Sequence, residues 1–429
     1  MDLAAADRAY LWHPFTQQRG WVDEHPVVVE RGEGTDLIDV EGNRYIDGVS
    51  SLWCNVHGHA HPRIDAAVRD QLGKVAHTTM LGLSHRPAIE LAQRLVELAP
   101  PGLTRVFYSD SGSTATEIAL KMAFQYWRQR GQDRRRFVAL RMAYHGDTIG
   151  SVSVGGIDLF HSLYEPLLFD TLKAEPGDIA DMERLLAQHR GDVAAVIMEP
   201  LVQGAAGMLV HPPGYLRAVR DLCDRHGVLL ILDEVATGFG RTGRMFACEH
   251  EGVAPDLMCL AKGITGGYLP LAATLATERI YEGFLGEHAE FRTFFHGHTY
   301  TGNPLACAAA VATLDVFREE RTIEGLRGKM DLLAALLEPV AANPMVREIR
   351  RCGFMVGIEL EEHPLPVRIG HRVTLEARRR GAIIRPLGDV VVLMPPLSIT
   401  REELTRLVTI TAEAIDAATE AAAELPRAA

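Results

Sequence analysis

Short apolar runs alternate with longer amphipathic stretches through the middle of the chain. The runs with the length of buried strands are Arg105–Tyr108, Phe137–Leu140, Val193–Met198, Val228–Leu232, Leu257–Ala261 and Leu271–Ala276. Between them, apolar residues recur with helical spacing, which predicts helices at Thr114–Arg130, Met182–His189 and Gly214–His226. Strands that alternate with helices are typical of a mostly parallel sheet with helices on both faces. The pattern therefore predicts an α/β fold.

The pattern changes near residue 325. The elements that follow a first helical stretch are an apolar segment at Val346–Leu360, a helix near Ile369–Arg380, a strand pair within Ala382–Pro396 that turns at Leu387-Gly388-Asp389, and a final helix from Arg401. This order predicts a smaller α+β domain. The N-terminal residues have strand patterns of their own, at Val27–Glu30 and Asp36–Val40. We therefore expect a large domain at 61–324, a small domain at 325–429, and an N-terminal segment at 1–60 that packs with the small domain.

Composition and charge exclude several classes of protein. Of 429 residues, 47% are hydrophobic and 23% are charged, as in folded globular proteins and unlike disordered chains. Asp and Glu number 56 against 44 Lys and Arg, and this net charge of −12 disfavours nucleic-acid binding. The longest apolar stretches, such as Leu305–Leu314, are shorter than the roughly 18 residues that a membrane-spanning helix needs. We expect neither nucleic acid nor a membrane as a partner.

The N-terminus and the cysteines favour a cytoplasmic location. The first ten residues carry Asp2 and Asp7 and lack the basic start and apolar run of a secretory signal. The six cysteines are scattered and form no CxxC pair, unlike the disulfide framework of a small secreted protein. We therefore predict reduced thiols and a cytoplasmic protein.

Two generic motifs indicate other functions. Gly238–Gly243 fits GxGxxG after an apolar strand, as in dinucleotide sites, but the following Met245–Val253 is short and mixed rather than a long amphipathic helix. Cys54–His61 gathers four potential zinc ligands, yet their spacing matches no common zinc pattern, and a hydrogen-bonded loop is the simpler interpretation. We predict no metal site.

An aspartate and a lysine each follow a predicted buried strand. Asp233 ends the run from Val228, and Lys262 follows the run from Leu257. Because ligands collect at the carboxyl ends of parallel strands, both side chains are expected to face one crevice. Burial would lower the pKa of Lys262 and make it a nucleophilic amine able to form a Schiff base with an aldehyde. Asp233 would then keep the ring nitrogen of a pyridoxal cofactor protonated. If each residue is considered alone, Asp233 could instead cap the next helix, and Lys262 could be a solvated surface residue.

Two further segments suit such a cofactor. The stretch from Ser109 to Thr114 precedes a predicted helix, whose N-terminal N–H groups would bind a phosphate. Tyr144 follows the strand at Phe137–Leu140 and offers an aromatic face for stacking on a pyridine ring. The simpler interpretations are an ordinary N-cap for Ser109–Thr114 and a core tyrosine for Tyr144. Because all these residues lie at strand ends of one α/β chain, together they favour the cofactor site.

Two stretches resemble the signature of a known family. They are Leu232-Asp233-Glu234-Val235-Ala236-Thr237-Gly238-Phe239-Gly240-Arg241-Thr242-Gly243, and Pro255-Asp256-Leu257 followed by Lys262-Gly263. Both are similar to the class III pyridoxal-phosphate aminotransferases, and the similarity extends from about Tyr10 to the C-terminal helix. The resemblance implies the transferase fold type I, pyridoxal 5′-phosphate as cofactor, and transamination as the activity.

Further stretches narrow the resemblance within the family. They are Leu11–Thr16, Ser51–His59, Asp110–Ser113, Tyr144–Thr148 and Arg385–Gly388. They look like the aminotransferases of biotin biosynthesis, which implies 8-amino-7-oxononanoate as the amino acceptor.

The resemblance also implies roles at the cofactor. Lys262 would bind the cofactor covalently and later move the proton, and Asp233 would pair with the ring nitrogen; with Tyr144 these are the expected catalytic residues. The other positions that match cofactor contacts are Gly112, Ser113, Val235, His298 and Thr299. His298 and Thr299 would reach the phosphate from the other subunit, which implies a homodimer with shared active sites.

Substrate contacts are implied in the same way. The matching positions are Phe15, Trp53, Tyr144, Lys262, Gly297 and Arg385, with Arg241 as a further candidate near the donor. The acceptor carries a carboxylate on a long apolar chain, so a guanidinium at Arg385 beside aromatic side chains would hold both ends. An exposed hairpin arginine is the alternative for Arg385, and a structural ion pair is the alternative for Arg241.

The sequence leaves the amino donor open between S-adenosylmethionine and lysine. Family members that use S-adenosylmethionine usually carry Tyr and Pro where this chain has Phe15 and His298, and Thr293–Asn303 looks more like the branch that uses lysine. The wider alternatives are a class III ω-aminotransferase for another amine or ω-amino acid, a noncatalytic pyridoxal-fold protein, and an NAD-dependent dehydrogenase built on Gly238–Gly243.

Overall fold

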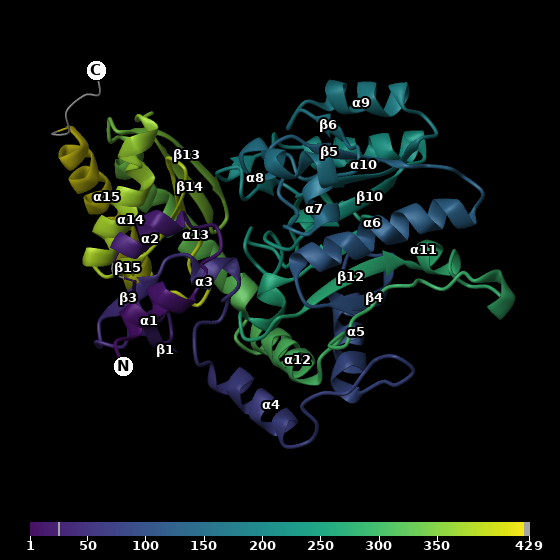
Figure 1. Cartoon of the computed structure of the whole chain (residues 1–429), viewed down its shortest axis with the longest axis horizontal. Coiled ribbons are helices and arrows are strands. Elements are labelled where there is room, and N and C mark those ends of the chain that lie inside the picture. The colour runs from purple at the N-terminus through teal and green to yellow at the C-terminus, as the bar shows by residue number, and fades with distance from the viewer. Residues whose placement is uncertain (25, 424–429) are drawn as a thin grey trace.

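A seven-stranded sheet forms the centre of the larger part of the molecule in the computed structural model, which describes residues 1–24 and 26–423 (Figure 1). The strands lie in the order β4 (Leu103–Ser109), β12 (Ala272–Thr277), β11 (Leu257–Leu260), β10 (Leu229–Asp233), β7 (Val193–Met198), β5 (Arg136–Leu140) and β6 (Leu172–Ala174). Neighbours are parallel except where β12 meets β11 and β4. The predicted α/β class and all six predicted strands are confirmed. The pattern misses β6, because three residues are too few to show a period.

Helices surround this sheet. They are α4 (Pro62–Leu72), α5 (Arg86–Leu98), α6 (Gly112–Gln129), α7 (Ile149–Val154), α8 (Asp158–His161), α9 (Ile179–Gln188), α10 (Tyr215–His226), α11 (Glu278–Glu282) and α12 (Pro304–Glu319), with a short hairpin of β8 (Val202–Gln203) and β9 (Leu209–Val210). The three helices predicted between strands are confirmed as α6, α9 and α10. None of the helices in the described part of the chain is long and apolar enough to span a membrane.

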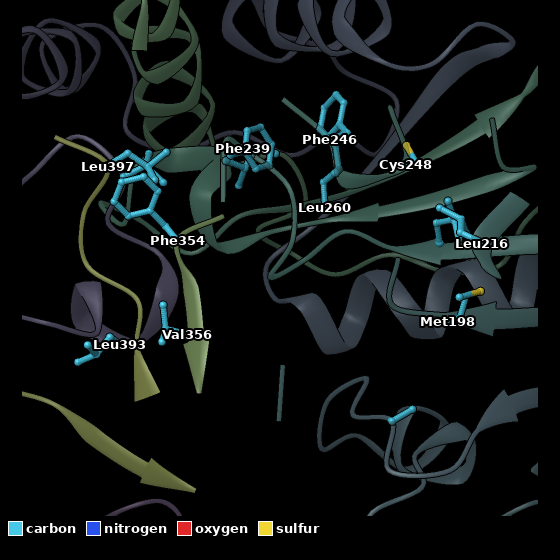
Figure 2. Close-up of a cluster of buried hydrophobic side chains, with 14 of the residues drawn as sticks. Met198, Leu216, Phe239, Phe246, Cys248, Leu260, Phe354, Val356, Leu393 and Leu397 are labelled. Carbon is cyan, nitrogen blue, oxygen red and sulfur yellow. The ribbon is translucent and has the colours of Figure 1, made fainter. Parts of the chain in front are cut away.

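Alternate residues of the central strands face different helix layers. In β10, Leu229 and Ile231 pack in the cluster that contains α6, whereas Leu230 and Leu232 pack in the larger core with α10. Successive side chains of a strand point to opposite faces, so a strand covered on both faces is apolar throughout, as β7 is. Figure 2 shows the larger core continuing beyond the sheet to Phe354. The two parts of the molecule therefore share one hydrophobic core.

A four-stranded antiparallel sheet and three helices form the smaller part. Its elements are α13 (Thr322–Ala341), β13 (Val346–Cys352), β14 (Met355–Leu360), α14 (Ile369–Arg379), β15 (Ala382–Ile383), β16 (Arg385–Leu387), β17 (Val390–Leu393) and α15 (Arg401–Ala423), with the sheet order β13-β14-β17-β16. The predicted turn joins β16 to β17, where Gly388 has a φ of +60°. The predicted apolar segment at Val346–Leu360 is a hairpin of two strands.

The N-terminal segment joins the smaller part through a second sheet. Its elements are α1 (Leu3–Tyr10), α2 (Gln18–Asp23), β1 (Val29–Glu33), β2 (Asp36–Asp39), β3 (Arg44–Asp47) and α3 (Ser50–Trp53). β3 pairs in parallel with β15, with Ile46 opposite Ala382. Figure 1 shows α1 and β3 beside α14 and α15, away from the seven-stranded sheet, whereas α3 lies on the side that faces the larger part. The first strand begins at Val29 rather than at Val27, because Val27 and Val28 lie outside the regular ladder.

Candidate active site

Asp233 and Lys262 lie together at the carboxyl edge of the large sheet. Asp233 is the last residue of β10, and Lys262 opens a single 3₁₀ turn, Lys262–Thr265, just after the adjacent strand β11. Both line a cavity of about 730 Å³, together with Trp53 and Tyr144. The Nζ atom of Lys262 is 5.4 Å from the ring centre of Trp53. The topology thus brings an amine, a carboxylate and two aromatic side chains to one cavity.

Burial makes the Lys262 amine unusually easy to deprotonate. The side chain is partly buried at the cavity wall, and desolvation lowers the pKa of Lys262, while Asp233 and Glu199 act in the opposite direction. An unprotonated amine is the nucleophilic form, so the site favours attack by Lys262 on a carbonyl carbon.

Asp233 is fixed by two hydrogen bonds. Its Oδ2 atom lies 2.7 Å from Nδ1 of His145, which donates to the carboxylate, and its Oδ1 accepts the N–H of Val235 at 3.0 Å. His145 is buried, and its Nε2 has no hydrogen-bond partner among the residues that the structure describes. The two hydrogen bonds fix the carboxylate at the wall of the cavity. Sequence reasoning gives His145 no role, although it directly follows Tyr144 in the loop after β5.

An anion cradle lies at the other end of the cavity, at the N-terminus of α6. Ser111 caps the helix by accepting the N–H of Thr114, and Ser113 Oγ contacts Thr148 Oγ1 at 2.8 Å. Two glycines allow the chain to approach closely here. A Cβ on Gly112 would lie 2.6 Å from Val235, and Gly146 has a φ of +115°. The N-terminus of a helix of this length favours a phosphate group.

Backbone strain is concentrated beside the cavity. Four successive residues, Ser50 to Trp53, have φ values of 44°, 42°, 66° and 73°, and Lys262 has a φ of 44°. Left-handed backbone costs about 1–2 kcal/mol for each residue with a side chain. Such conformations persist where the surrounding structure holds them, and they cluster at functional sites.

The residues present fit pyridoxal 5′-phosphate. The cavity volume lies within the roughly 300–1,000 Å³ of small-molecule sites. Lys262 would take the aldehyde, Asp233 would face the ring nitrogen, and the N-terminus of α6 would take the phosphate. Val235 also lines the cavity and packs against the position of Gly112.

Comparison with known proteins decides the family. The model for class-III aminotransferases matches residues 18–415. This chain belongs to the class-III aminotransferases. The aminotransferase therefore depends on pyridoxal 5′-phosphate, like the other members of this family.

Two relatives and one more distant structure illustrate the similarity. Adenosylmethionine-8-amino-7-oxononanoate aminotransferase from Nitratidesulfovibrio vulgaris is 61% identical over 98% of this chain and 83% of its own length. The crystal structure of the enzyme of that name from Methanocaldococcus jannaschii is 45% identical, with a TM-score of 0.95 over 97% of this chain and 98% of that one. An (S)-enantioselective omega-transaminase from Thermomicrobium roseum is 35% identical, with a TM-score of 0.93 over 97% and 98% of the two chains.

A second cavity of the aminotransferase contains the other expected acceptor residues. Phe15 and Arg385 line a space of about 1,010 Å³ between the N-terminal segment and the smaller part. Phe160 connects this space with the first cavity, because its ring contacts Phe15 at 5.5 Å and Tyr144 at 6.5 Å between ring centres. Five of the predicted substrate residues are thus divided between two neighbouring cavities: Trp53, Tyr144 and Lys262 line the first, and Phe15 and Arg385 line the second.

Gly297, His298 and Thr299 do not line either of these two cavities within this single chain. They lie on the segment between β12 and α12, where Thr299 is exposed and Nε2 of His298 is 3.9 Å from Asp110. Gly297 borders a separate, smaller hollow that also includes Leu81.

Arg241 stands apart from the other predicted substrate residues. Its side chain is 1% exposed and lines neither cavity. The guanidinium donates to the carbonyl of Pro395 at 2.5 Å, to Ser50 Oγ at 2.7 Å and to the carbonyl of Asn55 at 3.1 Å. These contacts tie three segments together, and none of them is the ion pair considered from the motif.

The GxGxxG segment and the Cys54–His61 segment do not have the structure of a dinucleotide site or a zinc site. Gly238–Gly243 is followed by a short 3₁₀ turn, Ala247–Glu251, not by the long helix of a dinucleotide site. The imidazoles near Cys54 point to separate partners: His57 to the carbonyl of Thr313, His59 to Asp47 and His61 to Glu320. In the described ranges, 1–24 and 26–423, no three His, Cys, Asp or Glu side chains form a potential metal site.

Proposed function

We propose that this aminotransferase converts 8-amino-7-oxononanoate to 7,8-diaminononanoate in biotin biosynthesis. The observation that carries the proposal is Lys262 beside Asp233 and Trp53 in one cavity, in a chain 61% identical to an enzyme named for that acceptor. When bound, the cofactor supplies an electron-withdrawing ring that stabilises negative charge on the carbon that loses a proton.

The chain's own residues supply binding and proton transfer. Lys262 would hold the cofactor through Nζ, and the same amine, once released, would accept and return the proton of the substrate carbon. Asp233, hydrogen-bonded to His145, would place its carboxylate beside the ring nitrogen. Tyr144 and Val235, which both line the cavity, would pack on the cofactor ring, and Gly112 and Ser113 at the N-terminus of α6 would hold the phosphate.

Arg385 and the aromatic side chains are proposed to bind the acceptor. Arg385 would pair with the acceptor carboxylate, while Phe15, Trp53 and Tyr144 would enclose its apolar chain. Arg241 is hydrogen-bonded to Pro395, Ser50 and Asn55, and it would not touch the donor. Its role would be to hold these segments in place behind the donor site.

Replacing Arg385 by alanine is expected to raise the KM for the acceptor by about 10- to 100-fold, because a charge-assisted hydrogen bond is lost. The donor half-reaction should change little. Separate single-turnover measurements of the two half-reactions check this result. Arg368→Ala is the matched control, since Arg368 lines the same cavity. An equal loss in both half-reactions would contradict the role of Arg385.

The donor is proposed to be S-adenosylmethionine or lysine. The name of the relative at 61% identity supports S-adenosylmethionine. Phe15 and His298, which stand where S-adenosylmethionine-using members usually have Tyr and Pro, support lysine.

A single-turnover absorbance experiment tests the function. The loaded enzyme is mixed with S-adenosylmethionine or with lysine until its visible absorption band disappears, and 8-amino-7-oxononanoate is then added. Return of the band with this acceptor supports the proposal and also identifies the donor. If the band returns only with other carbonyl compounds, the second candidate holds: an ω-aminotransferase, which the fold similarity to the Thermomicrobium roseum enzyme favours.

We also propose a cytoplasmic homodimer with shared active sites. A group of large apolar side chains is exposed around the segment of Gly297–Thr299; they are Leu81 (74% exposed), Phe291 (69%), Phe295 (73%) and Tyr300 (60%). Exposed apolar patches of this kind mark protein interfaces. Burial of this surface against a second copy would bring His298 and Thr299 to the partner's phosphate site.

A further inference from the structure

Glu199 is a buried acid that lines the active-site cavity and that the steps above do not use. It directly follows β7, and its side chain is enclosed on all sides. Among the described residues, no Lys or Arg side chain donates a hydrogen bond to the Glu199 carboxylate. Instead, Oε1 accepts the N–H of Gly204 at 2.9 Å, and Oε2 accepts the N–H of Tyr144 at 3.4 Å.

These two hydrogen bonds lead to the two aromatic walls of the cavity. Tyr144 is itself one wall. Gly204 lies against the other, because a Cβ placed on Gly204 would be 3.1 Å from Cζ3 of Trp53. One carboxylate therefore contacts the backbone behind each aromatic ring, in the loop after β5 on one side and in the β8–β9 hairpin on the other.

The charged groups around Glu199 come from several elements. His145 and Asp233 lie near its carboxylate, and the charge of Glu199 acts to raise the pKa of Lys262 across the cavity. His211, after β9, lies against the Glu199 main-chain carbonyl. The Glu199 side chain thus lies near the hydrogen-bonded pair of His145 and Asp233 and makes no direct hydrogen bond to either side chain.

We propose that Glu199 is a positioning residue that fixes the spacing between Tyr144 and Trp53 and thereby the fit of the acceptor's apolar chain. The identity of the acceptor rests on the function proposed above, whereas the spacing of the two walls does not. A carboxylate accepts both N–H groups strongly, and a neutral carboxylic acid accepts them weakly, so the ionised form holds the walls more firmly.

The proposal implies a dependence on pH. Burial raises the pKa of Glu199 to about 7, although His145 and the two backbone N–H groups oppose this shift. Below pH 7 the acid is mostly protonated and the walls are held weakly; above pH 7 it is ionised. The KM for the acceptor is therefore expected to fall as the pH rises through about 7.

Glu199→Gln tests the proposal in the intact loaded enzyme. The amide has one accepting oxygen, so one of the two N–H groups loses its partner, and the charge is removed at every pH. We expect an acceptor KM raised about tenfold, a kcat within about threefold of the original, and no change of KM across pH 7.

Glu234→Gln is the matched control. Glu234 is equally buried and likewise accepts two backbone N–H groups, from Ala247 at 3.0 Å and Cys248 at 2.8 Å, but it does not line the cavity. This variant should lose thermal stability and keep the original KM and its pH dependence. If both variants change the KM alike, the effect is general to buried acids and the proposal is overturned.

A spectroscopic measurement separates this proposal from the proposed function. The circular dichroism of the bound cofactor reports the asymmetry imposed by the surrounding aromatic walls and needs no acceptor. It should change with a midpoint near pH 7 in the original enzyme and in Glu234→Gln, and stay flat in Glu199→Gln. A wild-type enzyme that ignores 8-amino-7-oxononanoate would refute the function, while this titration would still decide the role of Glu199.

Gly204→Ala covers the case in which Glu199→Gln does not fold. The added methyl group would press on Trp53 without altering any charge. The KM for the acceptor should therefore rise, while the midpoint of its pH dependence stays near pH 7. An unchanged KM in Gly204→Ala, or an unchanged titration in Glu199→Gln, would overturn the proposal.

Discussion

Lys262→Ala is expected to abolish transamination, with a loss of at least about 10⁴-fold in kcat, and to leave the cofactor bound without a covalent link. The variant lacks the amine that both binds the cofactor and moves the proton, and no other lysine lines the cavity. Borohydride reduction followed by mass spectrometry of the peptides measures the covalent link, and single-turnover absorbance measures the residual rate.

Lys173→Ala is the matched control for that variant. Lys173 is also largely buried, and burial lowers its pKa to about 8, but its Nζ donates to the carbonyls of Ser153 and Gly155 behind β6. Its removal should lower the melting temperature and leave the cofactor link intact. Substantial turnover by Lys262→Ala, or a cofactor still attached after reduction, would rule out the assigned role of Lys262.

Asp233→Asn is expected to lower kcat/KM by about 10²- to 10³-fold, which corresponds to the loss of one preorganised electrostatic partner. The amide can still contact His145 but has no negative charge to place beside the ring nitrogen. Stopped-flow measurement of the donor half-reaction tests the loss directly, because this half-reaction requires the proton to leave carbon.

Asp256→Asn separates that effect from simple destabilisation. Asp256 is as buried as Asp233 and accepts from Arg220 at 3.0 Å, but it lies just before β11, away from the cavity. Breaking such a buried pair costs about 3–5 kcal/mol of stability. The control should therefore unfold at a lower temperature yet react at the original rate while folded. Equal rates for the two variants would contradict the role of Asp233.

Local pattern and sheet topology account for what the sequence predicts well. The apolar run at Val193–Met198 is long enough and uniform enough to be recognised as a strand buried on both faces. The rule that parallel strands end at one edge then places Asp233 beside Lys262 without any knowledge of side-chain contacts.

Contacts between distant segments account for what the sequence does not predict. The hydrogen bond from His145 to Asp233 joins residues 88 positions apart, and that from Tyr144 to Glu199 joins residues 55 apart. The left-handed run at Ser50–Trp53 contains no glycine, so no local signal marks it. Glu199 is visible in the sequence only as an acid at the end of an apolar strand, a position that a helix cap or a solvated side chain would fill equally well.

The buried guanidinium of Arg241 has a consequence for how substrates enter and leave. It connects the loop after β10 to Ser50 in the N-terminal segment and to Pro395 beyond β17. Domain closure or opening about a hinge would break these contacts and leave buried N–H donors of the guanidinium without acceptors, at a cost of about 1–3 kcal/mol for each donor. The two parts are therefore expected to move as one rigid body. Donor and acceptor are then expected to exchange through an opening whose shape is the same in both half-reactions.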